Sequence, residues 1–172
     1  YDLCKLMAGS HGTLAVLTEV TLKVLPAPEK SWTVLAFGLD DAAAVKAMSA
    51  AAGSPHEVAS LAHLPAAVAA RSAVGYVGGA GRAVTAIRIE GPGPSVEHRA
   101  AALKAQFASQ AELEELHSHN SAAFWREVRD VVPLLPDPSR AIWKLSVTPA
   151  AGAATVAAIR ERTDCEAYYD WA

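Results

Sequence analysis

Residues 83–107, AVTAIRIEGPGPSVEHRAAALKAQF, combine a strand pattern with the helix pattern that follows it. In 83–90, Ile87 and Ile89 fall on one face and charged residues fall on the other, as expected for a strand with one buried face. Pro94 then opens a helix, because proline is well tolerated in a first helical turn. The apolar residues of this helix form one stripe at helical spacing, namely Val96, Ala100, Leu103 and Phe107. The stretch therefore predicts a strand joined to a helix that packs on a sheet.

Similar patterns lie on both sides of this unit. Residues 32–39 (WTVLAFGL) form a strand pattern, and Asp40 is placed to cap an alanine-rich helix, with Val45 and Met48 inward, that ends at Gly53. Residues 57–64 and 112–117 are further strands. The resulting order, strand–helix–strand–strand–helix–strand, defines the ferredoxin-like, split βαβ arrangement. We predict an α+β fold with a mostly antiparallel sheet and helices covering one face.

The C-terminal part of the chain extends this arrangement with further α/β elements. We expect a helix over about 121–132, a strand over 141–147 (AIWKLSV), a helix entered through Thr148-Pro149, and a last strand over 165–171. The alternation in 141–147 predicts that Trp143 belongs to the core, while the face carrying Lys144 and Ser146 is an alternative wall of a substrate pocket.

The N-terminal part has a different pattern of apolar residues. Residues 2–8 read as the end of a helix that Gly9 stops, and a tight turn follows. Over 14–24 every second residue is apolar except Thr18, which predicts a strand with one buried face. Pro26 and Pro28 then form a stiff linker. This change of pattern at the prolines predicts that the chain has two structural parts, residues 1–28 and residues 31–172.

Composition excludes several classes of protein. The chain has 172 residues, a formal net charge of -3 and 52% hydrophobic residues, and it lacks the basic patch of a nucleic-acid-binding protein. No apolar run is long enough for a membrane span, and no signal-peptide pattern opens the sequence. Cys4 and Cys165 lie at opposite ends without neighbouring cysteines, so we expect buried free thiols. We therefore expect a soluble, cytoplasmic protein.

Several short motifs are weak candidates for chemistry. GYVGGAGRA (75–83) lacks the strand-then-helix context of a phosphate loop and predicts a flexible hairpin connection. HSHN (117–120) has no third metal ligand, and Ser118 or Asn120 suits a helix cap. The charged residues of 126–130 predict a solvated helix face. Ser10-His11 does not by itself form a nucleophile–base pair. We therefore predict no catalytic residue and no metal site in this chain.

The stretch YDLCKLMAGSHGTLAVLTEVTLKVLPAP (1–28) resembles the end of the FAD-binding domain in the p-cresol methylhydroxylase/vanillyl-alcohol oxidase family of FAD-linked oxidases. Within that family it is most similar to the FAD-binding subunits of bacterial glycolate oxidase (glycolate dehydrogenase). FWREVRD (124–130), AIWKLSVTP (141–149) and YYDWA (168–172) also look like the cap of that subunit. The resemblance is specific in residues 1–28 and 124–147 and loose between 40 and 120.

The resemblance implies that residues 1–28 end a PCMH-type FAD-binding domain and that 31–172 form the substrate-capping C-terminal domain. The residues it implies for FAD contact are Gly9, Ser10, Gly12, Thr13, Val16 and Thr18. The glycines permit close backbone approach, and Thr18 is the one polar residue on an apolar face. The alternative interpretation of the same residues is an ordinary glycine turn and a threonine whose hydroxyl is hydrogen-bonded to the backbone.

The implied reaction is oxidation of a small 2-hydroxy acid of the glycolate type to the 2-oxo acid. The implied partners are a second flavin subunit and an iron–sulfur subunit. The chain is then expected to be a truncated piece, without FAD or activity alone, whose 14–24 strand packs on the cap or on a second copy in a homodimer. Two alternatives stay open: the cap of a D-lactate dehydrogenase type of FAD-linked oxidase, and a non-catalytic binding or assembly module.

Overall fold

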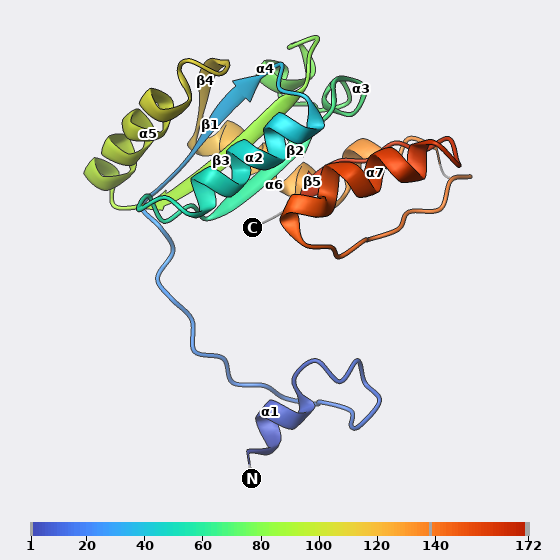
Figure 1. The fold of residues 1–172 in the computed structure, drawn as a ribbon. Coiled ribbons are helices and arrows are strands. Elements are labelled where there is room, and N and C mark those ends of the chain that lie inside the picture. Colours follow the sequence, from blue (N-terminus) through green and yellow to red (C-terminus); the bar gives the residue numbers. More distant parts are fainter. Residues whose placement is uncertain (1, 138, 171–172) are drawn as a thin grey trace.

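A five-stranded antiparallel sheet forms the centre of the computed structural model, which describes residues 2–137 and 139–170 (Figure 1). The strand order is β4-β1-β3-β2-β5, with hydrogen-bonded neighbours antiparallel throughout. The strands are β1 (Lys30–Phe37), β2 (Ser60–Leu64), β3 (Val84–Gly91), β4 (Glu112–His117) and β5 (Tyr169–Asp170). The helices are α1 (Leu3–Met7), α2 (Asp41–Ala52), α3 (Ala66–Ala69), α4 (Gly75–Gly78), α5 (Gly93–Phe107), α6 (Ser118–Arg129) and α7 (Gly152–Arg160), with 3-10 turns η1 (Val132–Leu134) and η2 (Pro149–Ala151).

The predicted fold class is confirmed. The first four strands, with α2 and α5 as their crossovers, give a ferredoxin-like βαββαβ unit, and β5 adds to the edge of β2. The connection between β2 and β3 joins antiparallel neighbours, as expected for 75–83, but it contains α3 and α4 and is therefore not a simple flexible hairpin loop. Gly81 adopts a φ of +65°, a backbone conformation that favours glycine.

Strand β1 is buried on both of its faces. Val34 and Ala36 join one hydrophobic core with α2 and α5, whereas Leu35 and Phe37 join a second core with α3, α4 and α6. The expectation that helices cover one face is therefore wrong. The physical reason is visible in the sequence, because a strand buried on both faces reads as a continuous apolar run, as VLAF does here.

The two crossover helices form as predicted. The side chain of Asp40 accepts a hydrogen bond from the Ala43 amide at 2.8 Å and so caps α2, and Val45 and Met48 are buried. In α5 the whole predicted stripe is buried, and Pro94 lies in its first turn. These helices cover the face of the sheet that carries Ile87 and Ile89.

The N-terminal arm, residues 2–29, extends away from the sheet (Figure 1). Helix α1 ends before Gly9, whose φ of +78° confirms the predicted left-handed stop. Residues 14–24 form no strand, and their apolar side chains are exposed, Val16 at 89%. The prediction of a strand packed on the cap is thus wrong for this chain. Alternation alone does not make a strand, because ladder hydrogen bonds need a neighbouring strand.

Residues 141–147 also form no strand, and Trp143 is 81% exposed. The prediction of a core tryptophan is wrong for the same reason as in the arm, since no strand edge lies alongside this segment in the described residues. Cys4 is exposed and Cys165 is partly exposed, so they are free thiols as predicted but not buried ones. The last strand is shorter than 165–171, and residues 171 and 172 lie outside the described residues.

Helix α6 packs on the second face of the sheet through a buried polar contact. The indole N–H of Trp125 donates to Thr33 Oγ1 at 2.8 Å, and the same oxygen lies 2.8 Å from Ser121 Oγ. Thr33 and Ser121 are fully buried. Each of these polar groups depends on the others for a hydrogen-bond partner, because water does not reach them.

Within the described residues, every helix is too short or too polar to traverse a lipid bilayer.

Replacing Thr33 with valine keeps the shape of the side chain and removes the shared oxygen. We expect the free energy of unfolding to fall by about 1–3 kcal/mol, because the Trp125 N–H and the Ser121 hydroxyl stay buried without that partner. Urea denaturation measures the change. Thr163→Val is the matched control: Thr163 is exposed, and its substitution should stay within about 0.5 kcal/mol. Equal losses in both variants would contradict a role for the buried contact.

Candidate functional site

The turn that carries most of the predicted cofactor residues is well formed. The Ser10 amide donates to the Met7 carbonyl at 3.2 Å, and the Thr13 amide and hydroxyl both donate to the Ser10 carbonyl, at 3.0 and 2.7 Å. Gly9 and Gly12 have φ values of +78° and +73°, and no atom lies within 4 Å of where their side chains would begin. The turn is thus open to a ligand on the side of these glycines.

Three backbone donors of this turn are free. The amide groups of Gly9, His11 and Gly12 donate to no acceptor in the described part of the chain. The amides of His11 and Gly12 are adjacent, whereas Gly9 is separated from them by Ser10, whose amide is bonded. Adjacent free amides in a turn are donors of the kind that bind an anion or a polar ring edge.

The structure does not assemble the whole predicted set. Gly9, Ser10, Gly12 and Thr13 share the turn, whereas Val16 and Thr18 follow on the exposed segment beyond it. Their assignment to FAD contact stays a prediction. The contact of Thr18 with FAD was predicted because Thr18 would lie on one face of a strand. Residues 14–24 have such a face only if a neighbouring strand pairs with them.

A second polar cluster, which we name the Asp41 cluster, joins Asp41, His63, Thr85, Arg160 and Tyr169 from five different elements. The Tyr169 hydroxyl and the Arg160 guanidinium both donate to Asp41 Oδ2 at 2.9 Å. Asp41 Oδ1 lies 3.3 Å from His63 Nε2. Asp41 begins α2, where the helix dipole favours a carboxylate.

His63 is the buried member of this cluster. Its side chain is 0% exposed, and its Nδ1 lies 2.9 Å from Thr85 Oγ1. Nε2 is buried and makes no well-directed hydrogen bond within the described residues. Burial lowers the pKa of His63 below its usual value, although Asp41 and Asp40 act in the opposite direction. Burial also disfavours the charged form of Tyr169, so burial and the hydrogen bond to Asp41 raise the pKa of Tyr169.

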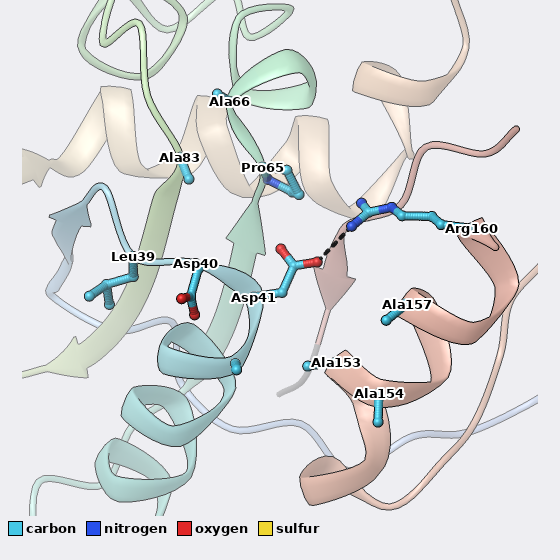
Figure 2. Close-up of a pocket in the computed structure, with 11 residues that line it drawn as sticks. Leu39, Asp40, Asp41, Pro65, Ala66, Ala83, Ala153, Ala154, Ala157 and Arg160 are labelled. Carbon is cyan, nitrogen blue, oxygen red and sulfur yellow. Dashed lines mark hydrogen bonds and ion pairs between the residues drawn. The ribbon is translucent and has the colours of Figure 1, made fainter.

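An open pocket of about 650 Å³ lies beside the cluster (Figure 2). Asp40, Asp41 and Arg160 supply its charged groups, and the ion pair between Asp41 and Arg160 crosses it. The remaining wall consists of small or apolar side chains, including Pro65 and Ala157. Because Asp41 and Arg160 already satisfy each other, the pocket offers few polar groups to a ligand.

Thr85, His63 and Asp41 are the residue types of a catalytic triad, namely a hydroxyl, an imidazole and a carboxylate. Thr85 and His63 are both fully buried, so no substrate reaches the hydroxyl. The cluster is therefore a structural contact. Sequence reasoning missed it, although His63 between Ala62 and Leu64, in a strand with little other polarity, was a detectable signal.

The weaker motifs have ordinary structural roles. His117 stacks on Trp32 with ring centroids 4.0 Å apart and lies 2.9 Å from Glu115. No cluster of three or more candidate metal ligands occurs in residues 2–137 and 139–170. The predicted cap at Ser118 or Asn120 is wrong, because His117 precedes α6 and no side chain caps it. Glu127 is not simply solvated, since it accepts hydrogen bonds from Ser72 and Ala73.

The fold and the site thus define an α+β, ferredoxin-like protein with a separate arm that carries a ligand-accessible turn. In comparisons with known proteins, no family model matches the chain. A stretch of 31 residues is 61% identical to the glycolate oxidase subunit GlcE of Escherichia coli (strain K12), covering 18% of this chain and 9% of that protein. A stretch of 29 residues is 62% identical to a D-lactate dehydrogenase of Anaerostipes hadrus, covering 17% of this chain and 6% of that protein. The names of both relatives are those of oxidoreductases.

Replacing Asp41 with asparagine tests the Asp41 cluster. We expect a loss of about 1–3 kcal/mol in the free energy of unfolding, because hydrogen bonds to a charged group are worth more than neutral ones. Asp164→Asn is the matched control. Its side chain is 95% exposed and pairs with Arg140 on the surface, so its loss should be about 0–1 kcal/mol. Chemical denaturation of both variants at pH 7 makes the comparison, and a smaller loss for Asp41→Asn than for the control would contradict this account.

Proposed function

We propose that this chain is part of a FAD-dependent oxidoreductase subunit that oxidises a small 2-hydroxy acid of the glycolate type to the 2-oxo acid. In this proposal residues 1–28 belong to the FAD-binding domain and residues 31–172 form the substrate-capping domain. The similarity to the glycolate oxidase subunit and to the D-lactate dehydrogenase supports an FAD-linked oxidase type. Since both are matched at nearly equal identity, a D-lactate dehydrogenase type is the second candidate.

The N-terminal arm carries this proposal. It presents a turn with three free amides, followed by a segment whose apolar side chains are uncovered. An apolar segment of this kind is costly in water and indicates a missing neighbour. A neighbouring strand of an FAD-binding domain would cover residues 14–24 and would also place the turn beside the cofactor.

The proposed cofactor contacts are made by the arm. Gly9 and Gly12 would let the flavin approach the backbone, Ser10 and Thr13 would add hydroxyl groups, and Val16 and Thr18 would line the strand that follows. FAD would supply the hydride acceptor for oxidation of the substrate carbon. The role of the capping domain would be to exclude water and shape the substrate pocket.

The remaining parts of the proposal concern the assembly. A second flavin subunit and an iron–sulfur subunit would receive the electrons, and the complex would reside in the cytoplasm. The competing reading is a non-catalytic binding or assembly module on the ferredoxin-like scaffold. Flavin content separates the two, because a module without a cofactor site gives a colourless protein in every context.

Gly12→Val, made in a protein that contains this chain together with its FAD-binding domain, tests the cofactor contact. We expect the flavin-to-protein ratio after purification to fall several-fold, because a side chain at Gly12 blocks close approach to the backbone. Absorbance of the purified protein gives the ratio.

Gly38→Val is the matched control for that variant. Gly38 has a φ of +80° and, like Gly12, has no atom within 4 Å of the position where its side chain would begin. Both variants therefore carry similar backbone strain, but Gly38 follows β1, far from the turn. Unchanged flavin content in Gly12→Val, or an equal loss in Gly38→Val, would contradict the proposed contact.

The 172-residue chain alone should bind no FAD at micromolar concentration. Its turn offers a few hydrogen bonds worth about 0.5–1.5 kcal/mol each, which does not offset the several kcal/mol lost on immobilising a ligand. Titration with FAD, followed by flavin fluorescence, measures this. Saturable micromolar binding would mean that the chain holds most of the cofactor site.

A further inference from the structure

The C-terminal strap, residues 152–170, is attached to the sheet by a short strand. Within the described residues, strand β5 pairs with β2 at two positions, Ala62 opposite Asp170 and His63 opposite Tyr169. The Asp41 carboxylate holds the strap twice more, through Arg160 on α7 and Tyr169 on β5. Other contacts hold the strap outside β5: Arg71 pairs with Glu166 at 2.6 Å, and the Tyr168 hydroxyl donates to the Val128 carbonyl at 2.7 Å. The contacts of β5 itself with the sheet and with α2 are the two residue pairs and the Tyr169–Asp41 bond.

His63 lies under this strap. It pairs directly with Tyr169 across the two strands, and the two rings have centroids 5.8 Å apart. The imidazole is fully buried, and its Nε2 lacks a well-directed partner in the described residues. While the strap is in place, a proton added to His63 would therefore enter a site without water.

The groups that face His63 come from every element around it. Asp40 and Asp41 of α2 attract a proton, Thr85 of β3 offers a neutral hydroxyl, and Tyr169 of β5 covers the ring. Arg160 of α7 neutralises part of the Asp41 charge from the far side. Burial outweighs the carboxylates, since the pKa of His63 lies below its ordinary value of 6.5.

We propose that His63 is a proton-sensitive latch for the C-terminal strap: uptake of one proton by His63 releases β5 from β2 and opens the wall of the adjoining pocket. The sign follows from linkage. The open state exposes His63 to water and binds the proton at the ordinary value, whereas the closed state binds it only at lower pH. The closed state is thus fully favoured above about pH 6.5 and loses ground as the pH falls below it.

Release of β5 breaks fewer contacts than unfolding of the sheet. Within the described residues, β5 leaves β2 when the two residue pairs and the bond between Tyr169 and Asp41 break, whereas β1 pairs along its whole length with β3. Release leaves the β2 edge unpaired, and an unpaired edge accepts another strand. The latch would therefore make this edge available in acid. This inference does not depend on the proposed cofactor or substrate.

Hydrogen–deuterium exchange of the whole chain between pH 8 and pH 5, read by mass spectrometry and corrected for intrinsic exchange rates, tests the latch. We expect exchange of peptides in 160–170 to increase by up to tenfold per pH unit below about 6.5, because one proton is coupled to opening. Peptides of β1 (30–37) should keep their protection. His63→Asn, which retains a hydrogen-bonding group near Thr85 but does not titrate, should abolish the pH dependence.

Two further variants complete the test. His98→Gln is the matched control, because His98 is exposed on α5, and it should behave as the unmodified chain. Tyr169→Phe removes the hydroxyl bond to Asp41 and should increase opening at every pH while keeping the slope, so it decides the question even if His63→Asn does not fold. The proposal is overturned if the strap shows no excess pH dependence over β1, if His63→Asn keeps that dependence, or if Tyr169→Phe leaves opening unchanged.

Discussion

The pairing of β1 with β3 is the interaction on which the rest of the structure depends. It runs over eight residue pairs, from Lys30 opposite Gly91 to Phe37 opposite Val84, and β1 also pairs with β4. Alternate residues of β1 enter two separate hydrophobic cores. Both helical layers are held by this one strand, so a polar substitution on either face would disturb the packing of the whole unit.

The remaining elements are attached to this unit with very different strength. The strap is held by the Asp41 carboxylate, by pairing of β5 with β2, and by contacts such as the ion pair between Arg71 and Glu166. The N-terminal arm is joined through Pro26 and Pro28, and its apolar residues stay uncovered. This difference in attachment is consistent with a sheet and helices that act as a scaffold, and with a strap and an arm that contact other surfaces. Binding residues are commonly placed on such segments.

Local patterns predicted the parts of the fold that local forces determine. The buried stripe of α5, from Val96 to Phe107, and the Asp40 cap of α2 were readable because helix periodicity and capping act within a few residues. The strands expected at 14–24 and 141–147 were not realised, because strand formation needs a distant partner that no local pattern reveals. The same limit hid the Asp41 cluster, whose members His63 and Tyr169 meet across two strands far apart in sequence. For the candidate site, the turn at Gly9 and Gly12 was predictable from glycine spacing, but the proposed cofactor contact would need surfaces outside the described residues.

We propose that the turn of the N-terminal arm meets a flavin while the ferredoxin-like sheet covers the substrate. An experimental structure of a FAD-loaded protein that contains this chain and a FAD-binding domain tests it most directly. We expect a free amide of Gly9, His11 or Gly12 within hydrogen-bond distance of the cofactor, residues 14–24 paired as a strand, and the order β4-β1-β3-β2 unchanged. A cofactor that contacts none of residues 9–18, with residues 14–24 still unpaired, would contradict it.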